Sequence, residues 1–147
     1  GAEAVQIFDS WAGVLPDAQF RAWVIEPTRA LVAAIRARHP ETPIIGFPRA
    51  AGAMYAEYAA KTGITALGLD ERVDLAQAKT FTLPVQGNLD PFVLRAGGNI
   101  LDAEIDRIIE TLEGTPFVFN LGHGVNKETP PEHVLQLVNR VRMLERM

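Results

Sequence analysis

Residues 117–134 read FVFNLGHGVNKETPPEHV and predict a buried strand, a glycine-flanked histidine and the start of a helix. The opening FVF is a short aromatic and β-branched run of the kind that forms buried strands. The glycines around His123 allow a sharp turn and the close approach of another molecule. Thr129, a proline pair and Glu132 have the pattern of a helix capping box. His123 is therefore predicted where a strand ends and before its helix begins, which is where α/β folds usually carry ligand chemistry. A loop histidine held by backbone contacts is the alternative interpretation.

The rest of the chain alternates between predicted strands and helices. The predicted strands are residues 4–9, 42–47, 64–70, 83–88 and 117–121. The predicted helices are residues 16–38, with a kink or two helices meeting at Pro27, and residues 50–62, 74–79, a segment after Pro91, 99–112 and 130–145. This α/β alternation predicts a parallel sheet, and the apolar run at 4–9 predicts a strand buried on both faces. Five units make either an open doubly wound sheet or the last five units of a barrel, since a closed barrel needs at least ~200 residues.

Apolar side chains at helical spacing are expected to form the core. They are Phe20, Trp23, Val24, Leu31 and Ile35 in the first helix, and Ile100, Leu101, Ile105, Ile108, Ile109 and Leu112 in the helix at 99–112.

The bulk composition indicates one globular domain over residues 1–147. The 147 residues are 48% hydrophobic and 22% charged, and the net charge of −4 includes no basic run. Nucleic acid and acidic membranes are therefore not expected as partners. The absence of cysteine excludes disulfides and thiolate metal sites, and it fits a cytoplasmic protein. No apolar run reaches the ~18 residues of a membrane span. A strand that begins almost at once after Gly1 suggests a cut from a longer protein.

Polar side chains follow four of the predicted strands. They are Asp9 with Ser10, Asp70, Asn88 with Asp90, and Asn120 with His123. Parallel strands bring these ends to one rim, where three carboxylates and a histidine could form a metal-assisted hydrolase site. Alternatively, each aspartate caps free N–H groups of the turn or helix that follows it. Arg49, also at a strand end, could bind a carboxylate through two hydrogen bonds or could be solvated.

Four blocks of the sequence resemble uroporphyrinogen decarboxylases. They are FDSWAG at 8–13, GLD at 68–70, QGNLDP at 86–91 and NLGHG at 120–124. The resemblance implies a TIM-type (β/α)₈ barrel, of which this chain holds about the last five strands. It also implies that Ser10 and His123 bind substrate and that Phe8 lines the cleft, with Asp70, Asn88 and Arg49 as further candidates. Glu71 stands where most relatives have a tryptophan, which is expected to change a packing position.

The resemblance implies an enzyme that converts uroporphyrinogen III to coproporphyrinogen III by removing CO₂ from four acetate arms, in porphyrin and heme biosynthesis. No cofactor or metal is expected, because the pyrrole ring itself takes up the electrons of the broken C–C bond. The family's arginine-rich block, its substrate-contacting aspartate and its cleft tyrosine have no counterpart here. The catalytic residues are therefore expected in a missing amino-terminal part, and this chain alone is expected to be inactive. A homodimer, or association with an amino-terminal fragment, is expected; a truncated, non-catalytic fragment is the alternative.

Overall fold

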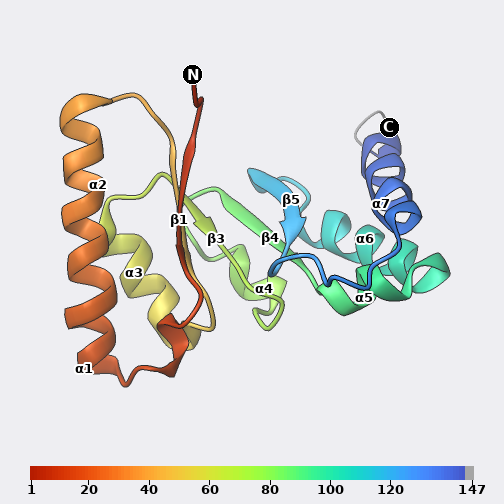
Figure 1. The fold of residues 1–147 in the computed structure, drawn as a ribbon, viewed down its shortest axis with the longest axis horizontal. Helices are drawn as coiled ribbons and strands as arrows, with labels where there is room; N and C mark the ends of the chain where they lie inside the picture. Colours follow the sequence, from red (N-terminus) through yellow and green to blue (C-terminus); the bar gives the residue numbers. More distant parts are fainter. Residues whose placement is uncertain (145–147) are drawn as a thin grey trace.

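The computed structural model describes residues 1–144 and contains a five-stranded parallel sheet with helices beside it (Figure 1). The strands are β1 (Val5–Asp9), β2 (Ile44–Pro48), β3 (Ala66–Gly68), β4 (Val85–Leu89) and β5 (Phe117–Leu121). They pair in the order β1-β2-β3-β4-β5, and every neighbouring pair is parallel. The predicted parallel sheet in chain order is confirmed, with β1 and β5 as its two edges.

The helical segments follow the strands in the predicted order. They are η1 (Ala12–Val14), α1 (Asp17–Phe20), η2 (Arg21–Ile25), α2 (Glu26–Arg38), η3 (Gly52–Met54), α3 (Tyr55–Thr62), α4 (Leu75–Ala78), α5 (Pro91–Ala96), α6 (Gly98–Leu112) and α7 (Pro131–Leu144). Glu145, the predicted end of the last helix, lies outside the described residues. No helix within residues 1–144 combines the length and the apolar character that crossing a membrane requires.

Two helical segments meet next to Pro27. The π-helical turn η2 ends at Ile25, and α2 begins at Glu26 with Pro27 in its first turn. A wider turn rotates the side chains that follow it. Phe20, Val24 and Ile25 are buried, whereas Trp23 is 67% exposed, so the prediction that Trp23 lies in the core is wrong.

The core lies between one face of the sheet and the helices packed on it, where α3 contacts β2 and α6 contacts β4. On α6 the buried stripe is Leu101, Ile105, Ile108 and Leu112. Ile100 precedes this stripe by one residue and is 65% exposed, and Leu31 on α2 is 48% exposed, so neither belongs to the predicted core. The helical period was therefore correct, and the errors are residues at the margin of the stripe.

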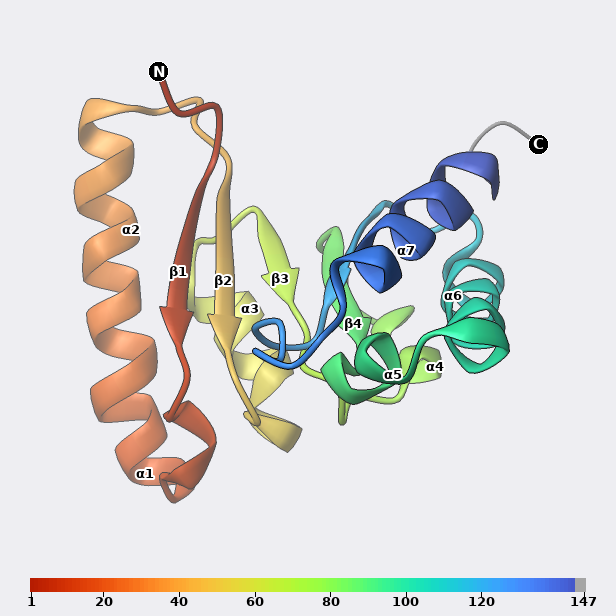
Figure 2. The same cartoon turned by 45° about the vertical axis from the view of Figure 1, so that its right-hand side comes forward.

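The opposite face of the sheet is largely uncovered in residues 1–144 (Figure 2). Phe8 on β1 is 67% exposed and Val118 on β5 is 52% exposed. The prediction that residues 4–9 form a strand buried on both faces is therefore wrong for this chain, and so is the burial predicted for β5. Both are edge strands, and the described helices pack on the other face. The uncovered face is the one that carries the candidate site.

Two capping predictions have different outcomes. Asp90 caps α5, as one interpretation of this residue predicted, by accepting a hydrogen bond from the Phe92 N–H group. Asp74, for which no cap was predicted, caps α4 in the same way through the Ala76 N–H group. The capping box at Thr129 does not form, because the Thr129 hydroxyl is buried without a hydrogen-bond partner among the described residues. The Thr129 N–H group instead donates to the Asn126 carbonyl in a turn before α7.

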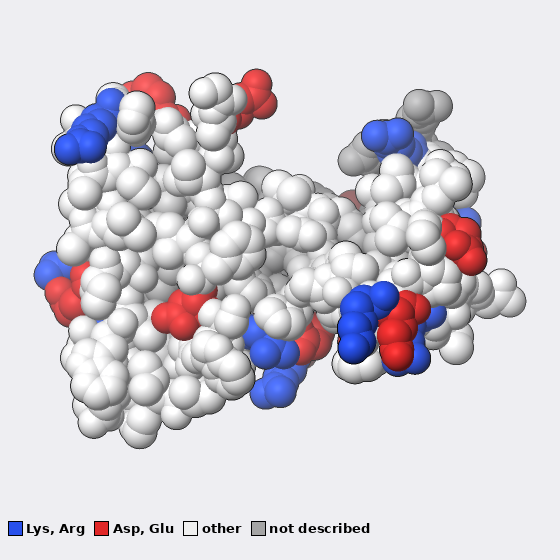
Figure 3. Space-filling model, viewed as in Figure 1, with Lys and Arg blue, Asp and Glu red and all other residues white. Residues whose placement is uncertain are grey.

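The charged side chains on the face shown in Figure 3 lie in small groups, several of which contain both signs. Arg21, Glu57 and Lys61 form one group of mixed sign in the structure, with both cations paired to the same carboxylate. The hydrogen bond from Arg21, followed by that from Lys61, lowers the pKa of Glu57 to about 2. This group is therefore fully ionised at neutral pH and belongs to the solvated surface.

Candidate functional site

A cavity of about 250 Å³ opens on the uncovered face of the sheet. Its lining comes from β1, β2, β4, β5 and the loop after β5: Gln6, Phe8, Phe47, Gln86, Asn120, Leu121, His123, Gly124 and Val125. The sheet must curve strongly to bring these residues together. The side-chain amide of Gln86 donates to the side-chain Oε1 of Gln6 at 3.2 Å, although β4 and β1 are separated by two strands. The curvature matches the wall of a barrel and places β1 and the β5 loop around one space.

The cavity has an aromatic wall and several polar groups. Phe8 packs edge-to-face on Phe47, with ring centroids 6.0 Å apart at an interplanar angle of 72°. Gln6, Gln86 and His123 contribute amide and imidazole groups, while the lining contains no lysine, arginine or carboxylate. Such a surface can pack against a flat, partly apolar ring and form hydrogen bonds with its polar edges.

The loop that carries His123 is fixed by the preceding glycine. The Gly122 N–H group donates to the Leu89 carbonyl at 2.8 Å. A Cβ atom added at Gly122 would lie 2.3 Å from the backbone nitrogen of Glu71, whereas one added at Gly124 would meet nothing within 4 Å. The close approach expected of these glycines is therefore made by Gly122 to the β3 end of the rim, and it leaves His123 exposed at the cavity.

Ser10 lies in the turn that follows β1 and is exposed, but it does not line this cavity. Its neighbour Asp9 accepts a hydrogen bond from the Trp11 N–H group at 3.2 Å, which fits the capping interpretation of that carboxylate. The substrate contact implied for Ser10 stays a prediction. Ser10 lies in the loop next to the cavity and is not among the residues that line it.

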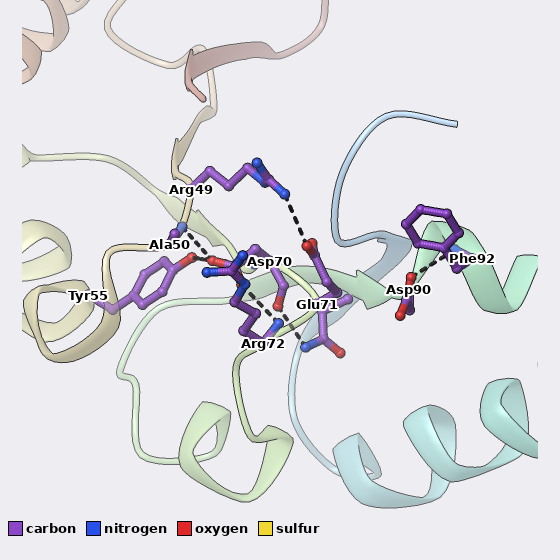
Figure 4. A network of polar contacts seen from close by, with 9 residues as sticks. Arg49, Ala50, Tyr55, Asp70, Glu71, Arg72, Asp90 and Phe92 are labelled. Carbon is purple, nitrogen blue, oxygen red and sulfur yellow. Dashed lines mark hydrogen bonds and ion pairs between the residues drawn. The ribbon is translucent and has the colours of Figure 1, made fainter. Parts of the chain in front are cut away.

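Asp70 is almost fully buried, at 1% exposure, and it holds the rim loops together (Figure 4). One carboxylate oxygen accepts from the Ala50 N–H group at 2.6 Å and from the Tyr55 hydroxyl at 2.5 Å. The other oxygen accepts from the Arg72 N–H group at 2.9 Å. Burial, followed by the hydrogen bond to Asp70, raises the pKa of Tyr55 far above its ordinary value, so this hydroxyl stays protonated. These contacts support the capping interpretation of Asp70 over direct contact with a ligand.

The side chain of Asn88 also holds the backbone of the rim in place. It is 4% exposed, and its side-chain amide donates to the carbonyls of Asp70 and Val73, both at 2.9 Å. Asp9, Asp70 and Asp90 all accept backbone N–H groups. Within residues 1–144 there is no group of three His, Cys, Asp or Glu side chains that could hold a metal ion. The metal-assisted hydrolase alternative therefore has no ligand set in this part of the chain.

Arg49 forms an ion pair with Glu71 at 3.1 Å, between the ends of β2 and β3 (Figure 4). The two side chains are 27% and 18% exposed. At Glu71 the sequence predicted a change in packing. The structure instead shows the Glu71 carboxylate paired with the Arg49 guanidinium. Arg49 is therefore not freely solvated, which removes one of the two interpretations of this residue.

Sequence reasoning missed Gln6 and Gln86 as lining residues. Each is a polar residue within an otherwise apolar strand, and a polar group at such a position needs a partner or a wet surface. That pattern could have identified both. Their pairing across the sheet could not, because it depends on the curvature.

Comparison with known proteins agrees with this geometry. The sequence model of the family described as uroporphyrinogen decarboxylase (URO-D) matches residues 1–144. The chain is 54% identical over 148 residues to a uroporphyrinogen decarboxylase of Gluconobacter oxydans, an alignment that covers 97% of this chain and 42% of that protein. It is 55% identical over 145 residues to one of Gluconacetobacter diazotrophicus, covering 97% of this chain and 41% of that protein.

The curved sheet, the β/α order and the cavity at the carboxyl ends of the strands define part of a TIM-type β/α barrel. The chain belongs to the uroporphyrinogen decarboxylase family. It spans 42% of the length of the Gluconobacter relative. The identification from the four sequence blocks is confirmed.

Proposed function

We propose that this chain forms one wall of the substrate cleft of a uroporphyrinogen decarboxylase, which converts uroporphyrinogen III to coproporphyrinogen III. The observation that carries the proposal is that Phe8 and His123, from the first strand and the last strand loop, line one cavity. Both are residues for which the family resemblance implies a place in the cleft. The cytoplasmic location expected from the composition belongs to this proposal.

In this cleft the two phenylalanines supply an apolar surface for the pyrrole rings. His123 forms a hydrogen bond with a carboxylate or a pyrrole N–H group, and the amides of Gln6 and Gln86 form others. Ser10 reaches the substrate from the adjacent loop. The cavity lining offers no cation for the eight carboxylates of the substrate, so further cations must come from the cleft rim and from the rest of the barrel.

The reaction needs an acid and an electron acceptor. Protonation of a pyrrole carbon makes the ring electron-poor, the bond between the acetate CH₂ and its carboxylate breaks, and the electron pair passes into the ring as CO₂ leaves. Proton uptake by the resulting methylene carbon and loss of the first proton give a methyl group, so each arm consumes one proton in total. No carboxylic acid lines the cavity within residues 1–144. We therefore place the acid in the part of the barrel that this chain does not contain.

A joined protein tests the proposal. It consists of the part of the Gluconobacter oxydans relative that this chain does not span, fused ahead of Gly1. We expect the joined protein to form coproporphyrinogen III from uroporphyrinogen III and the chain alone to form none. A joined protein that folds but releases no CO₂ would favour the non-catalytic alternative. Turnover by the chain alone would contradict the placement of the acid outside it.

A further inference from the structure

We propose that Arg49 is a carboxylate-binding residue at the rim of the cleft, and that Glu71 is an internal carboxylate that occupies Arg49 until substrate displaces it. The proposal deepens the function proposed above and rests on it. Three features carry it: the position of Arg49 beside the cavity, the rigidity of its backbone, and the incomplete ion pair with Glu71.

Arg49 lies between the loops that carry Ser10 and His123. It directly follows the end of β2, two positions after Phe47, which is a cavity residue. The Arg49 N–H group donates to the Asp9 carbonyl, and the Gly13 N–H group donates to the Arg49 carbonyl, both at 3.0 Å, so its backbone is tied to the Ser10 loop. On its other side, Glu71 lies against the backbone of Gly122, next to His123.

The backbone after Arg49 is held in a conformation that residues with side chains rarely adopt. Ala50 has a φ of +60°, in the left-handed region. The Asp70 carboxylate accepts its N–H group at 2.6 Å, and a Cβ atom added at Gly13 would lie 2.2 Å from its carbonyl oxygen. Strained residues of this kind persist where the surroundings over-determine them, and they cluster at functional sites. Figure 4 shows the Arg49 side chain running from this part of the rim toward Glu71.

The ion pair with Glu71 uses only part of the binding capacity of Arg49. One guanidinium Nη atom contacts one carboxylate oxygen at 3.1 Å. The Arg49 Nε atom and the other Glu71 oxygen are buried without a hydrogen-bond partner among the described residues. Once the guanidinium turns away from Glu71, a ligand carboxylate can take Nε and Nη together and form two parallel hydrogen bonds, the stronger geometry for arginine. A substrate carboxylate can therefore replace Glu71, and the negative charge of Glu71 opposes that replacement.

The experiment compares Arg49→Gln, Glu71→Gln, the double variant and Arg49→Lys in the joined protein. Two quantities are measured: the KM for uroporphyrinogen, and the Kd for coproporphyrin III, a fluorescent tetracarboxylate porphyrin, from fluorescence quenching. Arg140→Gln is the matched control, because Arg140 pairs with Asp106 on α6 at a similar exposure of 30% and 29% and lies outside the cavity lining.

We expect Arg49→Gln to raise KM and Kd about tenfold, which corresponds to about 1.4 kcal/mol. Glu71→Gln should lower both about threefold, the double variant should match Arg49→Gln, and Arg49→Lys should restore part of the loss. Arg140→Gln should change neither constant. Unchanged constants in Arg49→Gln, or weaker binding in Glu71→Gln, would overturn the proposal in favour of a purely structural ion pair. If Arg49→Gln does not fold, the direction of the Glu71→Gln effect decides alone. A joined protein without turnover defeats the proposed function, while its Kd values still test Arg49.

Discussion

Phe8, in the first strand, and His123, in the loop after the last strand, line the same cavity. The curvature of the sheet brings them together, as the hydrogen bond between Gln86 of β4 and Gln6 of β1 shows. Neither residue gains its place from a local contact with the other. A test of the site must therefore change the lining without disturbing the rim that sets its shape.

The first prediction concerns His123. In the joined protein, His123→Ala should lower kcat/KM for uroporphyrinogen at least about tenfold, a loss of about 1.4 kcal/mol, because a hydrogen bond to the substrate is removed. His39→Ala is the control, since His39 is an exposed histidine at the end of α2. Elemental analysis should find the same metal content in both variants and the parent. Stoichiometric zinc or iron that disappears only in His123→Ala would identify a metal ligand instead.

The second prediction uses the contrast between two glycines of the same loop. Gly122→Ala places a Cβ atom 2.3 Å from the Glu71 backbone nitrogen and should cost about 1–3 kcal/mol of stability, the usual range for overpacking. Gly124→Ala meets nothing within 4 Å and should change stability far less. Urea unfolding of the two variants of the joined protein measures the difference. Equal midpoints would show that the loop does not rest on the β3 end as described.

The third prediction concerns the buried pair of Tyr55 and Asp70. Tyr55→Phe removes one of the donors to a buried carboxylate and should cost about 1.5–3 kcal/mol at neutral pH. Burial, and then Asp70, hold the pKa of Tyr55 above its ordinary value of ~10, so the folded state keeps a proton that the unfolded state loses. Stability from this group is complete below pH ~10 and falls as the pH rises further.

Unfolding midpoints of the parent and of Tyr55→Phe, measured from pH 7 to pH 11, check both parts of this prediction. The parent should lose more stability above pH ~10 than the variant does. Some alkaline loss should remain in the variant, because burial raises the pKa of Tyr58 to about 12. Parallel curves for the two proteins would rule out the Tyr55 contribution.

The fourth prediction is that the chain alone does not stay a folded monomer. β1 and β5 are the edges of the sheet, and each leaves backbone groups on one side without a neighbouring strand in residues 1–144. Apolar burial contributes about 25 cal/mol per Å², so ~1,000 Å² left open forgoes ~25 kcal/mol of gross stabilisation. That exceeds the net stability of a typical domain, ~5–15 kcal/mol. Analytical ultracentrifugation at micromolar concentration should show self-association, and a compact monomer would count against this account.

Much of the fold could be predicted from the sequence because its determinants are local. β5 was predicted at the residues where it occurs, since glycine and proline precede an apolar run and a glycine-rich loop follows it. Gly63 ends α3 with a φ of +78°, as expected of a helix C-cap. The π-helical turn before Pro27 and the exposure of Trp23 were not predicted, because they depend on how α1 and α2 pack as a unit.

The candidate site was predictable only in part. The four sequence blocks identified the family and selected Phe8 and His123, which the structure brings to one cavity. They could not distinguish a carboxylate that binds a ligand from one that holds a loop, and the three hydrogen bonds to Asp70 answer that question for this residue. The partner of Arg49 could not be predicted either, because a contact between the loops that follow β2 and β3 leaves no pattern in the sequence.

The most direct test of the cleft wall is a crystal structure of the joined protein with coproporphyrinogen III bound. The account predicts that the tetrapyrrole lies on the uncovered face of the sheet and touches both the Phe8 ring and the His123 imidazole. A tetrapyrrole bound elsewhere, in contact with neither residue, would contradict it.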